Sequence, residues 1–205
     1  MDIGLVIKRI FDIVMCAVIL VVGFPVYAVI AVLVKLSSPG PVFFVQDRAG
    51  KDGRPFRMYK FRTMVGKKDE SILVWTQSDE DRITKVGRFL RDYGLDELPQ
   101  AVNILRGDMS IVGPRPPLPL QAERYTEHQK IVFTMRPGVI SLADVKGRRS
   151  IPMQERIEWH VRYVQNWSIR LDMKILWKTL FIVLRRENAN ETEFGEEKAS
   201  VMIDR

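Results

Sequence analysis

Two adjacent carboxylates, Asp96 and Glu97, are the residues of this chain best suited to chemistry. Arg88 and Arg91 precede them by one or two helical turns, and a Gly-Pro-Arg-Pro turn containing Arg115 follows them. Carboxylates can attack a phosphorus atom or hold a divalent cation, and arginines bind the phosphate through paired hydrogen bonds. The grouping is typical of a metal-assisted reaction on a phosphate.

The two carboxylates are expected to differ in role. Asp96 stands at a predicted helix start, where the helix N-terminus and the preceding arginines should keep it ionised. An ionised Asp can attack phosphorus and form an acyl-phosphate, which splits one transfer into two steps. Glu97 points about 100° away around the helix and is free to hold Mg²⁺, which takes one or two carboxylates plus phosphate oxygens. The alternative stays open at this point: Asp96 could merely cap the helix beside a solvated Glu97.

More arginines stand next to Gly or Pro. Arg136 precedes Pro137-Gly138, and Arg148 and Arg149 follow Gly147. Arginine held on a stiff loop suits bidentate phosphate recognition, so the set indicates a phosphate site, although each alone is more often a surface charge.

Other catalytic motifs are absent from the sequence. It holds no P-loop, no G-x-G-x-x-G, no paired zinc motif and no Ser-His-Asp candidate. His128 and His160 are isolated, and each is assigned to the surface or the core. Cys16 is the single cysteine, so no disulfide framework and no disulfide-linked partner are expected.

An apolar segment precedes these groups. Residues 13–34 carry no charge, and as a helix they would measure roughly 33 Å, enough to cross a bilayer core. Pro25 lies within the run and should kink the helix, and basic residues flank both sides: Lys8 and Arg9 before, Lys35 after. Because positive flanks favour the cytoplasmic side, a re-entrant helix broken at Pro25 and a simple span both remain open.

The remaining elements follow from turn and periodicity signals. Strands are expected over 42–46 and 55–63, as a hairpin around 50–53. A helix is expected over 78–93, capped by Ser78 or Asp79 and ended by Gly94. A following helix should begin at Asp96, turn Leu98, Val102 and Leu105 inward, and end at Gly107. Two helices over 152–186, split near 166–168, carry Trp and Phe beside cations, which suits the membrane interface or ordinary core packing.

Charge is distributed unevenly along the chain. The formal net charge is +7 over 205 residues, but the last 19 residues carry −4, which leaves +11 on residues 1–186. The acidic tail is expected to be disordered. The basic body implies an anionic partner, which could be nucleic acid, an anionic lipid surface or a phosphorylated substrate. Without a recognisable nucleic-acid module, no nucleic-acid partner is expected.

Several ordered motifs resemble a known family, the monotopic phosphoglycosyl transferases among the bacterial sugar transferases. The resemblance covers about residues 1–186 and is carried by these segments: SPGPVFFVQDRAG, YKFRTM, LDELPQAVNILRGDMSIVGPRP, RPGV, VKGR and YVQNWSIRLDMKIL.

The resemblance implies a helix-rich α+β fold in three parts. Residues 1–36 would form a re-entrant membrane helix broken near Pro25. Residues 37–186 would form a catalytic domain on the cytoplasmic face of the bacterial inner membrane, with a small β-hairpin and interfacial amphipathic helices. Residues 187–205 would form the acidic tail.

The resemblance also implies a reaction. A UDP-sugar would donate its sugar-1-phosphate to polyprenol phosphate, releasing UMP, with Asp96 as the covalent nucleophile and Glu97 as the Mg²⁺ ligand. The partners implied are the UDP-sugar, polyprenol phosphate and membrane phospholipids. The candidate phosphate-binding residues are Arg91, Arg115, Arg136, Arg148, Lys60 and Arg62.

This chain departs from the family pattern where the donor could be recognised. Ile140, Ser141 and Asp144 stand where Thr-Gly and a Gln are usual, Lys146 and Arg149 flank Gly147-Arg148 where Asn is common, and His160 takes a place often held by Asp. These positions leave the identity of the sugar open. A non-catalytic, membrane-anchored basic protein is the alternative function.

Overall fold

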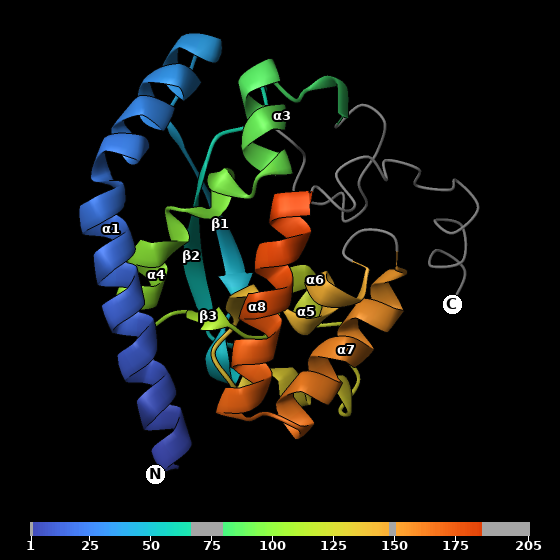
Figure 1. The fold of residues 1–205 in the computed structure, drawn as a ribbon. Coiled ribbons are helices and arrows are strands. Elements are labelled where there is room, and N and C mark those ends of the chain that lie inside the picture. The colour runs from blue at the N-terminus through green and yellow to red at the C-terminus, as the bar shows by residue number, and fades with distance from the viewer. Residues whose placement is uncertain (1, 67–79, 148–150, 186–205) are drawn as a thin grey trace.

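A computed structural model describes residues 2–66, 80–147 and 151–185 (Figure 1). A long N-terminal helix, α1 (Ile3–Ser37), flanks a body in which shorter helices surround two small sheets. The shorter helices are α3 (Lys85–Asp92), η2 (Leu95–Glu97), α4 (Gln100–Arg106), α5 (Pro119–Ala122), η3 (Gln129–Thr134), α6 (Leu142–Lys146), α7 (Met153–Gln165) and α8 (Ile169–Arg185). The prediction of a helix-rich α+β fold is confirmed.

The expected hairpin is present. Strand β1 (Phe43–Ala49) pairs antiparallel with β2 (Pro55–Phe61), from Phe43 opposite Phe61 to Ala49 opposite Pro55. The turn, η1 (Lys51–Gly53), places Asp52 and Gly53 at positive φ of 56° and 72°. Strand β1 continues three residues beyond the predicted end because the pairing persists to the turn.

A second sheet was not predicted from the sequence. Strand β3 (Ser110–Val112) pairs parallel with β4 (Gly138–Ile140). Gly113 and Gly138 meet backbone to backbone, and a Cβ at Gly113 would lie 2.6 Å from the carbonyl oxygen of Arg136. The Gly-Pro-Arg-Pro turn and the Arg-Pro-Gly turn are therefore pressed together, and a side chain at either glycine would separate them.

The helix predicted over 78–93 is interrupted before α3. Ile83 forms an isolated bridge with Met64, and Thr84 caps the helix by accepting a hydrogen bond from Gly87 N at 2.8 Å. The predicted caps, Ser78 and Asp79, lie outside the described residues. Glu80 and Asp81 are helical, but strand-like pairing at Ile83 interrupts the predicted helix, so one continuous helix up to residue 93 was wrong, whereas the end before Gly94 is confirmed.

Helix α1 packs on the body along one face. Cys16, Ile30 and Val34 are buried, and the opposite face leaves Val21 and Val22 more than 70% exposed. Within the described part of the chain α1 is the one helix long and apolar enough to cross a membrane. It does not end at Pro25, although it changes direction in its upper part in Figure 1. A proline removes one backbone hydrogen bond, which permits a bend within a helix that continues on both sides.

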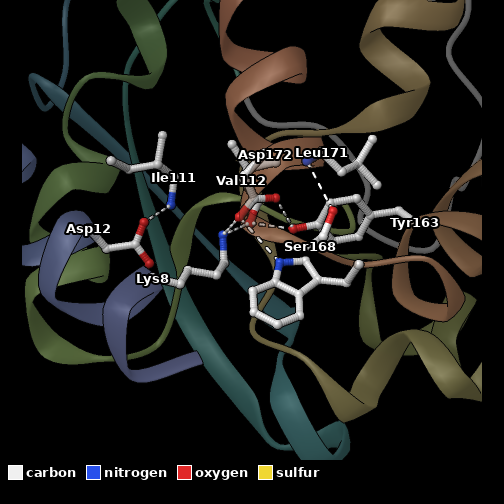
Figure 2. A network of polar contacts seen from close by, with 9 residues as sticks. Lys8, Asp12, Ile111, Val112, Tyr163, Ser168, Leu171 and Asp172 are labelled. Carbon is white, nitrogen blue, oxygen red and sulfur yellow. Dashed lines mark hydrogen bonds and ion pairs between the residues drawn. The ribbon is translucent and has the colours of Figure 1, made fainter. Parts of the chain in front are cut away.

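A buried polar network fastens the start of α1 to the body (Figure 2). Lys8 donates from Nζ to Asp172 Oδ2 at 2.6 Å and to the carbonyl of Val112 at 2.8 Å. Tyr163 donates its hydroxyl to Asp172 Oδ1 at 2.7 Å, and Trp167 donates Nε1 to Oδ2 at 3.3 Å. The network ties α1 to β3, α7 and α8 at one point.

The two predicted C-terminal helices are present as α7 and α8, separated at residues 166–168. Trp177 and Phe181 on α8 are exposed and contact each other edge to face. The acidic segment 187–205 lies outside the described residues.

Candidate functional site

Asp96 and Glu97 lie on η2, a single 3₁₀ turn between α3 and α4. Gly94, with φ of 68°, ends α3 in a left-handed conformation and starts this turn. Helix α4 then begins after Pro99, which makes no side-chain capping bond. Asp96 is therefore not a helix cap, and the alternative role left open by the sequence is wrong. Of the described residues, none donates a hydrogen bond to the Asp96 carboxylate.

Glu97 is held by two cations. Its Oε1 accepts from Lys60 Nζ at 2.5 Å and from Arg115 Nη2 at 2.9 Å. Burial alone would raise the pKa of Glu97, but the charges and hydrogen bonds of Lys60 and Arg115 hold it well below its usual range. Glu97 is therefore an ionised carboxylate whose Oε2 accepts no hydrogen bond from the described residues.

Asp96 lies in a different electrostatic environment. Burial raises the pKa of its carboxyl, as does the charge of Glu97, whereas Lys60, Arg91 and Arg115 oppose the shift. The sequence-based expectation named only the cations and missed desolvation, which is the largest influence. Arg88, which was expected to frame the dyad, is more than half exposed and pairs with Glu80 at 3.7 Å instead.

Asn103, which the sequence reasoning did not single out, joins the two halves of the site. It is fully buried on α4, accepts from Tyr59 N at 3.1 Å, and donates to the carbonyl of Arg57 at 2.7 Å. These bonds fix β2, which carries Lys60, against the helix that follows Glu97. The only feature of the sequence that could have pointed to Asn103 is its position as a polar residue between the inward-facing Ala101 and Ile104.

The inward face of α4 also differs from the prediction. Ala101 and Ile104 are buried, whereas Leu105 is 37% exposed. Because α4 begins at Gln100 rather than Asp96, its apolar face is rotated relative to the predicted one.

Comparison with known proteins identifies the chain's relatives. A model of the family described as bacterial sugar transferase matches residues 3–186. The chain belongs to this family.

Individual relatives of this sugar transferase differ in length. It is 41% identical over 182 residues to the UDP-glucose:undecaprenyl-phosphate glucose-1-phosphate transferase of Escherichia coli (strain K12), covering 85% of this chain and 39% of the relative. It is 40% identical to the uncharacterized sugar transferase EpsL of Bacillus subtilis (strain 168), covering 92% of each. It is 37% identical to the undecaprenyl-phosphate galactose phosphotransferase of Salmonella typhimurium, covering 89% of this chain and 41% of the relative. The chain thus spans about two fifths of the longer relatives.

The sugar transferase brings together only part of the predicted phosphate site. Lys60 and Arg115 contact Glu97, and Arg91 acts on Asp96 through its charge. Arg62 instead donates to the carbonyls of Val34, Ser38 and Pro39 at the end of α1, at 3.1, 2.7 and 3.1 Å.

Arg136 lies elsewhere as well. Its Nε donates to the carbonyl of Gly107 at 2.8 Å, and it lines a cavity with Lys8, Arg9 and Lys51. Arg148 lies outside the described residues.

Two of the departures from the family pattern, Asp144 and His160, lie close enough to Arg115 to interact with its charge. Ser141 and Asp144 form a capping box that starts α6, with Ser141 N donating to Asp144 Oδ2 at 2.8 Å. Asp144 also acts on Arg115 through its charge. His160 is buried, and this burial lowers its pKa to about 4 despite the opposing charge of Asp144, so it is neutral at pH 7. The sequence assigned His160 to the surface or core, and the structure places it in the core close to the site.

The donor set suits a divalent cation that shares its ligands with a substrate. Among the described residues no three His, Cys, Asp or Glu side chains converge as a complete metal site. Asp96 and Glu97 provide two adjacent carboxylates with oxygens that accept no hydrogen bond from the described residues. Mg²⁺ is commonly bound by one or two carboxylates, with water and substrate phosphate oxygens completing the shell. The residues present fit Mg²⁺ in that manner.

Proposed function

We propose that this sugar transferase moves a sugar-1-phosphate from a UDP-sugar to undecaprenyl phosphate, releasing UMP and forming a polyprenyl diphosphosugar. The reaction would be the first membrane step of glycoconjugate biosynthesis. The E. coli and Salmonella relatives are named for transfers of this kind. The observation that carries the proposal is that the two carboxylates lie in different environments. Glu97 is paired with Lys60 and Arg115, whereas Asp96 accepts no hydrogen bond from the described residues.

The different environments of Asp96 and Glu97 support a transfer reaction in two steps. In the first, an Asp96 carboxylate oxygen bonds to the phosphorus that carries the sugar, and the bond from that phosphorus to the UMP oxygen breaks. In the second, a phosphate oxygen of undecaprenyl phosphate attacks the same phosphorus and displaces Asp96. Asp96 suits this role because partial burial strips water from its carboxylate and nearby cations still favour the ionised form.

The cations around the dyad have separate tasks. Arg115 and Lys60 hold Glu97 in place and supply positive charge where negative charge develops on the transferred phosphate. Arg91 favours the ionised form of Asp96. Glu97, with its free Oε2, would hold Mg²⁺, which when bound neutralises phosphate charge and stabilises the departing UMP.

We also propose that the protein is monotopic on the cytoplasmic face of the inner membrane. Helix α1 would enter the bilayer and return, with its bend at Pro25. This arrangement is favoured because α1 is packed on the body at Cys16, Ile30 and Val34, which a helix crossing the bilayer away from its domain could not maintain. The exposed Trp177 and Phe181 of α8 would lie at the headgroup level.

The proposed reaction does not specify which sugar is transferred. The named relatives carry glucose and galactose in their names, and the positions where this chain departs from the family pattern, Ser141, Asp144 and His160, lie near Arg115. We expect these positions to influence the choice of sugar.

A UMP-release assay tests the proposal. Full-length protein in detergent or nanodiscs is mixed with Mg²⁺, undecaprenyl phosphate and each member of a panel of UDP-sugars. At least one donor should yield UMP only when the lipid and Mg²⁺ are present. Lipid-surface binding without UMP release from any donor would support the alternative of a non-catalytic, membrane-anchored protein.

A further inference from the structure

Arg48, at the end of β1, has a largely enclosed guanidinium and no role in the two-step reaction described above. Its Nη2 donates to Gln46 Oε1 at 2.7 Å, and its Nη1 donates to the carbonyl of Pro116 at 3.1 Å. Pro116 directly follows Arg115, and the adjacent Ala49 donates its N–H to the carbonyl of Pro117 at 3.0 Å. The end of β1 therefore holds the backbone on which Arg115 is mounted.

The charge of Arg48 has no ionic partner in the described part of the chain. Within the described ranges no carboxylate lies at ion-pairing distance from it, and its buried Nε has no hydrogen-bond partner. Burial lowers the pKa of Arg48 to about 10, the neighbouring Arg115 acts in the same direction, and Glu97 opposes them. Arg48 thus remains charged at neutral pH.

A buried charge without a counter-charge is unfavourable in the free protein. Near the dyad, Lys60 and Arg115 pair with Glu97, and Asp144 also acts on Arg115 through its charge, whereas Arg48 has no ion pair with any described residue. An incoming anion would supply a counter-charge. The diphosphate of a nucleotide sugar has the charge to do so, because its two phosphates are both ionised.

We propose that Arg48 is a positioning residue for the donor's diphosphate. It fixes the Pro116 carbonyl, and with it the guanidinium of Arg115 beside Glu97, and it adds a positive charge that the carboxylates leave uncompensated. The inference rests on the proposed function, since it assumes a UDP-sugar donor.

Binding of UDP and UMP to a turnover-deficient protein tests this inference. Arg48→Gln is introduced into full-length Asp96→Asn protein, and affinities are measured by isothermal titration with Mg²⁺ present. The Kd for UDP should rise about tenfold or more, because a buried charge and its hydrogen bonds are lost. The Kd for UMP, which lacks the second phosphate, should rise less. In the otherwise wild-type enzyme the same substitution should raise KM for the donor more than it lowers kcat.

Arg57 on the neighbouring strand provides the matched control. It is exposed, so Arg57→Gln removes the same charge from the same hairpin without touching the turn at Pro116. This variant should bind UDP as the parent does. Arg48→Lys, which keeps the charge but loses the two-pronged guanidinium, should fall between the parent and Arg48→Gln.

Three outcomes overturn the inference about Arg48. These are unchanged UDP affinity in a folded Arg48→Gln protein, equal losses for UDP and UMP, or an equal loss in Arg57→Gln. If Arg48→Gln does not fold, parent-like UDP affinity in Arg48→Lys overturns it instead. Absence of UMP release by the wild-type enzyme would reject the proposed function itself, whereas wild-type release with unchanged UDP affinity in Arg48→Gln rejects only the role of Arg48.

Discussion

Two carboxylate clusters in this protein both contain cations but differ in how their oxygens are hydrogen-bonded. At the foot of α1, Asp172 accepts from Tyr163 on one oxygen and from Lys8 and Trp167 on the other. At the dyad, Glu97 receives both cations on one oxygen, and Asp96 receives no hydrogen bond from the described residues.

From this difference we infer that the cluster at Asp172 is structural, and we propose that the dyad is reactive. A satisfied buried network fixes a contact between elements, and here it joins the long apolar helix α1 to the strand before the Gly-Pro-Arg-Pro turn. A carboxylate held among cations without hydrogen bonds of its own keeps its oxygens available for a substrate. Loss of the first cluster should therefore affect stability, and loss of the second should affect turnover.

The largest expected effect is that of Asp96→Asn on turnover. UMP release should fall on the order of 10⁴-fold, because an amide cannot act as the nucleophile. The thermal midpoint should stay level or rise, since burial disfavours the charged carboxylate. An Asp96→Asn variant that loses stability as well as activity would contradict the assignment of turnover to the dyad and stability to the Asp172 cluster.

Asp172→Asn should give the opposite pattern. Removing this charge leaves Lys8 buried without a counter-charge, which should lower the free energy of unfolding by about 3–5 kcal/mol in a denaturant titration. The double variant Lys8→Met/Asp172→Asn should recover part of that loss, since it removes both charges. A single variant as stable as the wild type would show that the network does not hold α1.

Arg115→Lys should have the next largest effect, again on turnover. A lysine retains charge but loses the planar fork that meets Glu97 and the phosphate, so kcat/KM should fall about 10²-fold. Arg57→Gln, the exposed hairpin control, should leave kcat/KM unchanged. Equal losses in the two variants would indicate that general positive charge, rather than the geometry at Glu97, supports the reaction.

The pH dependence should give the smallest effect. Because burial raises the pKa of Asp96, kcat/KM should fall with decreasing pH through a midpoint above the usual Asp value of about 4. Lys60→Met should move that midpoint higher, since Lys60 is the strongest influence opposing the shift. A midpoint that moves down in Lys60→Met would contradict the assignment to Asp96.

The same two carboxylates should affect stability in opposite directions. Asp96, with its raised pKa, contributes stability below its unfolded pKa and loses it as the pH rises through the folded value. Glu97, with its lowered pKa, contributes stability above its unfolded pKa and loses it as the pH falls through the folded value.

Local signals allowed much of the framework to be predicted. Gly94 and Gly107 end their helices as expected, and the hairpin and the split between α7 and α8 follow from turn residues and periodicity. The continuity of the helix predicted over 78–93 was misjudged because Ile83 fits a helical stripe yet pairs with Met64, a contact that periodicity cannot reveal.

Prediction of the site was limited by long-range contacts. Lys60 and Arg115 were named from motifs, but nothing local shows that both meet one oxygen of Glu97. Arg62 and Arg136 stand in equally suggestive motifs and instead bind backbone carbonyls. Asn103 and Arg48 act through residues distant in the chain, so their roles depend on the tertiary structure.

The central claim is that Asp96 attacks the sugar-bearing phosphorus, and trapping the covalent intermediate tests it most directly. Full-length protein is incubated with Mg²⁺ and a reactive UDP-sugar without undecaprenyl phosphate, then digested and analysed by mass spectrometry. We predict a sugar-phosphate adduct on Asp96 that disappears on adding the lipid acceptor and is absent from Asp96→Asn. An Asp96→Asn enzyme that turns over normally, or an adduct located on another residue, would contradict the account.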